Sequence, residues 1–390
     1  MKVLVFSPHA LADSSSGVAQ SIANLLGELV RLGHSCVAVT GSVLDAKNDL
    51  FSKVMVAEPI TTFTVPQVGL SVPVRKVSYQ GVIHLIAGFK SHATADVMST
   101  EEVALYRLFT DSFRQLEPDV VLTYGGFISN YCAGLYAMSR GRKSVLYVAS
   151  DTYAQPGNFS HADMIVTVSN AMSRLMDGVT DLPKLVLPPF FDKASVIATA
   201  RTPDYITLLN PLPAKGLMLA AALALESARK GRPYKFLFVE GRGTRATIHA
   251  LCPAVLALPT IGIADNTADV KLVYERSKVI LFPSVWFETA GKVLLEANAN
   301  GIPVLATNIG GIPEMLDGAG YLFDPPQACV DKWDTPAPAD YVAKWLDVLD
   351  RLHNDPAEWD DAVRRAKAAD SRYDLARLAQ SFVDFAGQNP

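Results

Sequence analysis

Two glutamates, a glycine and a lysine with the chemistry to bind a phosphorylated ligand stand close together near residue 290. Glu288 lies in an expected loop, Gly291 begins an expected helix, and Lys292 and Glu296 follow on that helix. The first N–H groups of a helix lack partners within it and its dipole is positive at that end, so this position favours an anion. Gly291 lets a phosphate approach the backbone closely, and Lys292 adds a formal positive charge.

The two carboxylates suit a second part of the same ligand. Ionised Glu288 and Glu296 accept hydrogen bonds, so both can bind sugar hydroxyls. An anion site flanked by two such acids is what a nucleotide-diphosphate sugar requires. The alternative is a solvated surface that carries two acids. Leu294 and Ala297 favour instead a packed helix, in which an unpaired Glu296 would be costly.

Alternating strands and helices position these residues in the second half of the chain. Short β-rich apolar runs alternate there with alanine-rich or amphipathic runs. The expected strands are 205–209, 235–239, 279–282 and 304–307, and the expected helices are 216–230, 270–277 and 292–300. The last fifty residues are expected to be helical, with breaks near Asp355 and Asp370.

The first half shows the same alternation. Val3–Phe6 is an expected strand, apolar residues recur at helical spacing over 18–32, and Gly33 stands where a left-handed cap would fall. The run Cys36–Thr40 completes a βαβ unit, and such units build parallel sheets that bind ligands beyond the carboxyl ends of their strands. Residues 53–92 are less regular and are interpreted as an elaboration of this domain.

Length and composition narrow the class of protein. A chain of 390 residues exceeds what one hydrophobic core organises, so two domains are expected. Hydrophobic residues make up 49% and charged residues 19%, as in globular proteins with sizeable cores. The net charge of −4 gives no support to nucleic-acid binding. No apolar run reaches the length of a transmembrane helix.

Other features favour a cytoplasmic location. The chain starts with residues that turn polar too quickly for a signal peptide. The four cysteines lie far apart without metal-ligand spacing, which is typical of free thiols in a reducing compartment. The expected domains are 1–195 and 196–370, and a helix over 371–390 is expected to pack back on the first domain.

The motifs around residue 290 resemble the signature of group 1 glycosyltransferases, a large retaining family (family 4) of the GT-B fold. The resemblance rests on the spacing of Glu288 and Glu296, on the segment GIPV at 301–304 and on GGIPE at 310–314. Lys215, followed by glycine, looks like the family's phosphate-binding lysine. The resemblance extends weakly over nearly the whole chain. It implies an α/β protein with two Rossmann-like, doubly wound domains facing a central cleft.

The resemblance also implies a role for each matching residue. Glu288 would hold donor-sugar hydroxyls near the reacting carbon, and Lys215 would neutralise the departing diphosphate, so these two would be catalytic. The donor-binding residues would be Glu296 at the ribose, the amides of Ala290, Gly291 and Lys292 at the diphosphate, and the loop backbone near Gly262 at the base. The acceptor-side residues would be Ser16, Gly17, Ser150 and Asp151.

The implied reaction moves a sugar from a nucleotide-diphosphate sugar to a hydroxyl acceptor with retention of configuration. Preorganised donors would stabilise the leaving diphosphate, and no metal is expected because no Asp-x-Asp motif stands out. The nucleotide sugar is a co-substrate and no further cofactor is implied. UDP is favoured over GDP. The acceptor is a carbohydrate, a lipid or a small metabolite, and domain closure would exclude water.

Several positions depart from the family pattern. Pro211 stands where many relatives carry an arginine four residues before the phosphate-binding lysine, and Lys292 or Arg242 could supply the missing charge. For Arg242, a solvated loop arginine is an equal alternative. Where the family carries a first-domain histidine, this chain has the segment around Ser150, which contains no histidine. Structural roles are favoured for the chain's own His9 and His161.

Two further segments leave alternatives open. The family's double glycine in the first loop is Ser16-Gly17 here, and an ordinary serine helix cap is an equal interpretation. The basic and apolar stretch 74–90 could touch a lipid surface, but a β-structured insertion is favoured. Membrane contact is therefore not indicated.

Two other functions remain open beside glycosyl transfer. One is a GT-B relative that acts as a nucleotide-sugar epimerase or forms a different bond. The other is a silent nucleotide-binding protein, against which Glu288, Glu296 and Lys215 argue. Product analysis distinguishes the epimerase-type relative from a glycosyltransferase. A test of donor turnover distinguishes the silent binding protein from either enzyme.

Overall fold

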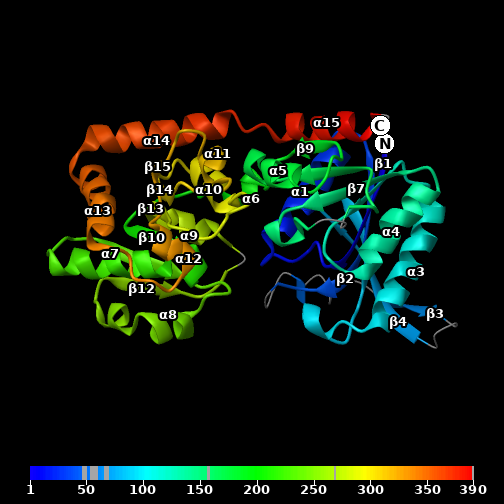
Figure 1. Cartoon of the computed structure of the whole chain (residues 1–390), viewed down its shortest axis with the longest axis horizontal. Coiled ribbons are helices and arrows are strands. Elements are labelled where there is room, and N and C mark those ends of the chain that lie inside the picture. The colour runs from blue at the N-terminus through cyan, green and yellow to red at the C-terminus, as the bar shows by residue number, and fades with distance from the viewer. Residues whose placement is uncertain (46–50, 53–59, 66–69, 156–158, 268, 389–390) are drawn as a thin grey trace. The chain divides into compact units, whose positions relative to one another are not determined.

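The computed structural model describes residues 1–45, 51–52, 60–65, 70–155, 159–267 and 269–388. The chain divides into two compact units (Figure 1). Unit 1 comprises Met1–Phe191 together with Asp374–Pro390, and unit 2 comprises Asp192–Tyr373. Each unit has its own sheet and is described by itself. The last helix thus belongs to the unit that contains the start of the chain.

Unit 1 is built on a nine-stranded sheet in the order β3-β4-β5-β2-β1-β6-β7-β8-β9. Strands β3, β4 and β5 form an antiparallel meander, and the remaining neighbours pair in parallel. The strands are β1 Lys2–His9, β2 Ser35–Val43, β3 Ile60–Val65, β4 Leu70–Tyr79, β5 Val82–Ala87, β6 Val120–Thr123, β7 Lys143–Val148, β8 Met164–Thr167 and β9 Lys184–Val186.

The helices of unit 1 bury one apolar face against this sheet. In α1 the residues at helical spacing, such as Ile22 and Leu29, are fully buried, and Gly33 just beyond the helix has a φ of +86°. Helix α15 packs against α1. The helices are α1 Gly17–Arg31, α3 Ser99–Leu116, α4 Ile128–Ser139, α5 Asn170–Asp177 and α15 Leu375–Ala386, with short turns η2 Thr94–Asp96 and η3 Asp151–Tyr153.

Unit 2 is built on a six-stranded sheet in which every described pairing is parallel, in the order β12-β11-β10-β13-β14-β15. Numbered within the unit, this is the doubly wound order 3-2-1-4-5-6, whose direction of winding reverses between β10 and β13. The strands are β10 Tyr205–Leu209, β11 Lys235–Val239, β12 Ile261–Ala264, β13 Ser277–Phe282, β14 Val304–Thr307 and β15 Tyr321–Phe323.

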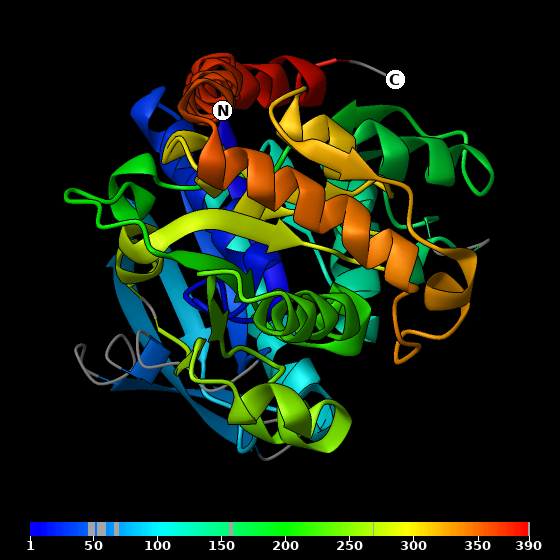
Figure 2. The same ribbon diagram turned by 90° about the vertical axis from the view of Figure 1, so that its left-hand side faces the viewer.

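The core of unit 2 lies between this sheet and its longest helices. Phe236 and Phe238 of β11 are fully buried, as is Trp345 of α13, and α7 packs beside α13 (Figure 2). The helices are α6 Lys193–Val196, α7 Leu217–Arg229, α8 Arg245–Leu251, α9 Lys271–Arg276, α10 Lys292–Ala299, α11 Ile312–Leu316, α12 Gln327–Asp331, α13 Ala339–Asn354 and α14 Pro356–Ser371, with turns η4 Pro213–Lys215 and η5 Pro253–Ala257.

The predicted architecture of two doubly wound α/β domains is confirmed. Two local expectations were wrong. The first strand runs to His9 and not to Phe6, because a register shift after Ser7 lets β1 continue along β2. Gly262 does not lie in a loop, because Ile261 to Ala264 pair with β11 as an edge strand. Among the described residues, no helix is long and apolar enough to cross a membrane.

Candidate functional site

Lys215 and Glu288 meet at the point where the sheet of unit 2 reverses its winding. Lys215 follows β10 and Glu288 follows β13, and ligands of open parallel sheets bind beyond the carboxyl ends of such strands. Lys215 Nζ lies 2.5 Å from Glu288 Oε1, and Ser284 Oγ donates to the same oxygen at 2.6 Å. The side chain of Glu288 is 6% exposed and that of Lys215 is 18% exposed. The acid is therefore buried with its charge compensated.

Close backbone contacts hold the loops that carry this ion pair. Gly216 has a φ of +82°, and a Cβ at this residue would lie 2.0 Å from the carbonyl oxygen of Pro283. Gly310 has a φ of +58°, and its Cβ would lie 2.1 Å from the carbonyl oxygen of Glu288. Only glycine fits either position. The amide of Gly311 donates to the same Glu288 carbonyl oxygen at 2.7 Å, so three loops are fastened together.

A tryptophan that the sequence reasoning did not single out lies against Lys215. The Lys215 ammonium stands 4.8 Å from the ring centroid of Trp286, a cation–π distance. The ring of Trp333 meets Trp286 edge-on, with centroids 6.4 Å apart. The motif around Glu288 includes Trp286, but nothing in its spacing reveals that its ring faces a lysine seventy residues earlier.

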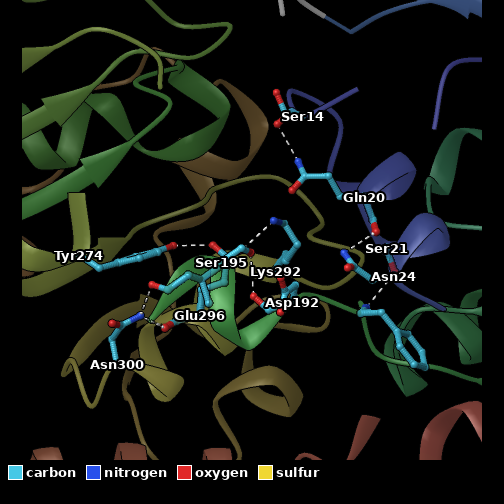
Figure 3. A network of polar contacts seen from close by, with 12 residues as sticks. Ser14, Gln20, Ser21, Asn24, Asp192, Ser195, Tyr274, Lys292, Glu296 and Asn300 are labelled. Carbon is cyan, nitrogen blue, oxygen red and sulfur yellow. Dashed lines mark hydrogen bonds and ion pairs between the residues drawn. The ribbon is translucent and has the colours of Figure 1, made fainter. Parts of the chain in front are cut away.

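Glu296 is bound through both of its carboxylate oxygens. Lys292 Nζ lies 2.6 Å from Oε1, and the hydroxyl of Tyr274 donates to Oε2 at 2.5 Å (Figure 3). Glu296 is 2% exposed and Tyr274 is fully buried. Burial, followed by the nearby Glu296 carboxylate, raises the pKa of the Tyr274 hydroxyl well above its ordinary value. The phenol therefore stays protonated and acts as the donor. Tyr274 was also missed by the sequence reasoning.

The start of α10 provides backbone donors beside these side chains. Gly291 is the residue before the helix and has a φ of +121°, and the first turn of α10 carries no acidic side chain. Ala290 is 4% exposed in the loop that leads to this turn. The helix dipole is positive at this end, so the start of α10 favours an anion. The structure thus brings together Lys215, Glu288, Ala290, Gly291, Lys292 and Glu296 on the segments after β10 and β13.

The other two donor-side candidates lie on neighbouring strands. Arg242 is exposed in the loop after β11, and that loop packs on the loop after β10. The amide of Gly243 donates to Asn210 Oδ1 at 2.8 Å, and a Cβ at Gly243 would lie 2.4 Å from the carbonyl oxygen of Pro211. Arg242 is thereby placed beside the position of the absent arginine. Gly262 lies on the edge strand β12, two strands from β10.

The acceptor-side candidates lie in unit 1, at the carboxyl ends of its strands. Ser16 is buried and is the N-cap residue of α1 by position, but its side chain makes no capping hydrogen bond. Gly17 is exposed at the first position of α1. Ser150 follows β7, and its hydroxyl lies 2.8 Å from Thr152 Oγ1 in the short turn that contains Asp151.

His9 ends β1 next to the strand β6, where the sheet of unit 1 reverses its winding. Its half-buried ring lies 5.5 Å from the rings of both Tyr124 and Phe127. Burial lowers its pKa, an effect partly opposed by the charges of Asp45 and Asp13. His161 also has a pKa lowered by burial, and it packs on Tyr131. Of the two histidines, only His9 stands at the reversal point of the sheet.

The comparison with known protein families matches a segment of unit 2. Residues 211–335 match the model of the family described as glycosyl transferases group 1. A D-inositol 3-phosphate glycosyltransferase from Arthrobacter sp. (strain FB24) is 37% identical over 95 residues, which are 24% of this chain and 19% of that protein. The match therefore spans about a fifth of the length of this curated relative.

Solved structures resemble the whole chain. A glycosyltransferase from Rickettsia africae ESF-5 has a TM-score of 0.67 at 15% identity and covers 99% of this chain and 97% of its own. Anabaena Alr3699/HepE, solved in complex with UDP and glucose, has a TM-score of 0.66 at 13% identity with all of both chains covered. These likenesses confirm the predicted GT-B fold.

Proposed function

We propose that this chain, which carries a group 1 glycosyl transferase domain on a GT-B fold, transfers a sugar from a nucleotide-diphosphate sugar to a hydroxyl acceptor with retention of configuration. One observation carries the proposal. Lys215, Glu288 and the start of α10 converge where the parallel sheet of unit 2 reverses its winding. This is where such sheets bind nucleotides. The Anabaena structure contains UDP and glucose, which supports a nucleotide-sugar ligand.

Stabilisation of the leaving diphosphate is the main catalytic effect in this proposal. Negative charge grows on the diphosphate as the bond to the sugar breaks. Lys215, Lys292 and the amides from Ala290 to Lys292 offer positive charge and N–H donors on one short stretch of surface. Because the amides are held by packed loops, these N–H donors stabilise the transition state without reorganising. The acceptor hydroxyl attacks on the face that the diphosphate leaves, so the anomeric configuration is retained.

The two acids position the donor. Glu288 binds hydroxyls of the transferred sugar, and Glu296 binds the ribose. The proposed reaction needs no metal ion. Arg242 takes the place of the family arginine, which is supported by the packing of its loop on Pro211. UDP is the favoured nucleotide over GDP, with the base near Gly262.

The acceptor belongs to unit 1 in this proposal, on the residues that follow its parallel strands. Ser16 and Gly17 lie after β1, and Ser150 and Asp151 lie after β7. A carbohydrate, a lipid or a small metabolite would each present the required hydroxyl.

A donor-turnover experiment tests the function. The purified protein is incubated with UDP-glucose, GDP-mannose or ADP-glucose and with glucose as acceptor, and nucleoside diphosphate release and product are followed by NMR. The proposal predicts release from one donor and a product whose anomeric proton coupling matches that of the donor. An inverted product would contradict retention, and an epimerised donor without transfer would contradict the proposed reaction.

A further inference from the structure

We propose that Tyr274 orients Glu296 to bind both hydroxyls of a ribose, so that the enzyme takes ribonucleoside rather than deoxyribonucleoside diphosphate sugars. The inference rests on the proposed function, because it concerns the ribose of the donor nucleotide. Its basis is the hydrogen bond of 2.5 Å from the Tyr274 hydroxyl to Glu296 Oε2. Tyr274 precedes β13 on α9, and Glu296 follows that strand on α10. It is a positioning residue, since it acts through Glu296.

The hydrogen bonds of Glu296 leave it suited to a diol. An ionised carboxylate has about four lone-pair sites. Tyr274 uses one on Oε2, and Lys292 uses one on Oε1 at 2.6 Å. Each oxygen therefore keeps further accepting capacity. The 2′- and 3′-hydroxyls of a ribose are neighbouring donors, and they match two oxygens of one carboxylate in a single bidentate contact.

The two partners of Glu296 differ in mobility. The phenol of Tyr274 is fully buried and is stiff, so it holds Oε2 in one place. The Lys292 ammonium sits on a flexible four-carbon stem, and its side chain is 17% exposed. A nucleotide diphosphate offers Lys292 a stronger partner at the start of the same helix. Lys292 can therefore move to the phosphate and leave Oε1 free to bind the ribose, whereas Tyr274 keeps the Glu296 carboxylate in its orientation.

Burial makes the contact selective. Glu296 is 2% exposed, so a bound nucleotide that lacks the 2′-hydroxyl leaves this buried carboxylate with one hydrogen bond fewer. A site built to bind a hydroxyl rejects an analogue that lacks it, because its buried polar group stays unpaired. We expect a preference of at least tenfold for the ribonucleotide.

The test compares ribonucleotide and 2′-deoxyribonucleotide affinities by calorimetric titration of UDP, GDP and ADP and their 2′-deoxy counterparts. In the Tyr274→Phe variant the preference for the ribonucleotide over the deoxyribonucleotide should fall below about threefold, because the Glu296 carboxylate loses the hydrogen bond that orients it. A loss of protein stability alone would lower the affinities for both nucleotides equally and leave the ratio of these affinities unchanged. The matched control is Tyr321→Phe, which removes another tyrosine-to-glutamate hydrogen bond in unit 2, to Glu358 at 2.8 Å.

A second variant keeps the test decisive if Tyr274→Phe does not fold. Lys292→Met should weaken nucleotide binding through the phosphates but keep the tenfold ratio, since Tyr274 still holds Oε2. The inference would be overturned if the wild type bound ribonucleotides and deoxyribonucleotides equally well. It would also be overturned if Tyr274→Phe kept the wild-type affinity ratio, or if Lys292→Met brought that ratio close to one. Absence of any nucleotide binding to the wild type would instead count against the proposed function.

Discussion

At the scale of single residues, the site pairs each of its two acids with a lysine. Lys215 binds Glu288 and Lys292 binds Glu296, and both carboxylates are almost fully buried. Burying an unpaired charge is strongly unfavourable, so the lysines stabilise the fold around the acids. The same lysines are the groups proposed to bind the diphosphate. The arrival of phosphate would thus release the acids for the hydroxyls of the donor.

Replacing Glu288 by glutamine should separate nucleotide binding from sugar transfer. We expect Glu288→Gln to lower kcat at least a hundredfold, because an amide cannot hold the sugar hydroxyls as a carboxylate does. Affinity for the nucleoside diphosphate should stay the same or rise, since Lys215 loses its competing partner. Steady-state rates and calorimetric titration measure the two effects. Glu226→Gln, the same change at an exposed ion pair with Arg229, serves as the control and should alter neither. A variant that transfers sugar at the wild-type rate would remove Glu288 from the catalytic site.

The residue types and spacing predicted much of this site but not its internal contacts. Glu288, Gly291 and Glu296 stand in one short motif, so their spacing in the sequence was enough to predict them as site residues. Tyr274 and Trp286 contact their partners only through the fold. A tyrosine in an amphipathic helix looks like an ordinary core residue, and nothing local indicates that its hydroxyl meets a carboxylate.

At the scale of elements, tight turns after the strands bring the site together. The helix boundaries at Gly33 and Gly291 were predicted from these glycines, and both have a positive φ. The extension of β1 to His9 was not predicted, because Pro8 normally ends a strand pattern and only pairing with β2 sustains it.

Replacing Gly216 by alanine should strongly destabilise unit 2. Its φ is +82°, and the added Cβ would lie 2.0 Å from the backbone oxygen of Pro283, which cannot move aside as a flexible side chain would. We expect a loss of about 2–4 kcal/mol in unfolding free energy, measured by urea denaturation. Gly231→Ala is the matched control, because Gly231 has a φ of +65° but no atom within 4 Å of its Cβ position. That change should cost only about 1 kcal/mol. Equal losses for both variants would contradict the role of the contact with Pro283.

At the scale of the whole molecule, the two units differ in their response to acid. Unit 1 contains four histidines whose pKa values are lowered mainly by burial, namely His9, His34, His84 and His161. For His84, which is 1% exposed, burial lowers the pKa to about 4. Between pH 6.5 and about 4 the unfolded chain binds a proton at this residue that the folded unit does not. The unfolding free energy of unit 1 therefore falls as the pH falls through this window.

The His84→Leu variant should reduce this acid sensitivity. Between pH 7 and pH 5 the wild-type histidine contributes a loss of about 2 kcal/mol, which follows from a shift of its pKa from 6.5 to about 4. Urea denaturation at the two pH values, followed by probes in unit 1, measures the difference. If the variant loses as much stability as the wild type on acidification, His84 is not the group responsible.

The order of strands and helices predicted two doubly wound domains, and the structure has them. Periodicity reports where elements begin and end, but it does not report which side chains meet. The acceptor side illustrates the difference. His9 stands at the reversal point of the unit 1 sheet only because β1 lies between β2 and β6, an order that no local pattern specifies.

Binding of a nucleotide by Glu296 in unit 2 is the central claim, and a thermal shift experiment tests it most directly. The wild type and Glu296→Ala are melted with UDP, GDP, ADP and dTDP at about a hundred times the dissociation constant, where a ligand stabilises by roughly 2.7 kcal/mol. The account predicts that one ribonucleoside diphosphate raises the melting temperature of the wild type and not of Glu296→Ala. No shift with any nucleotide, or an equal shift in the variant, would contradict it.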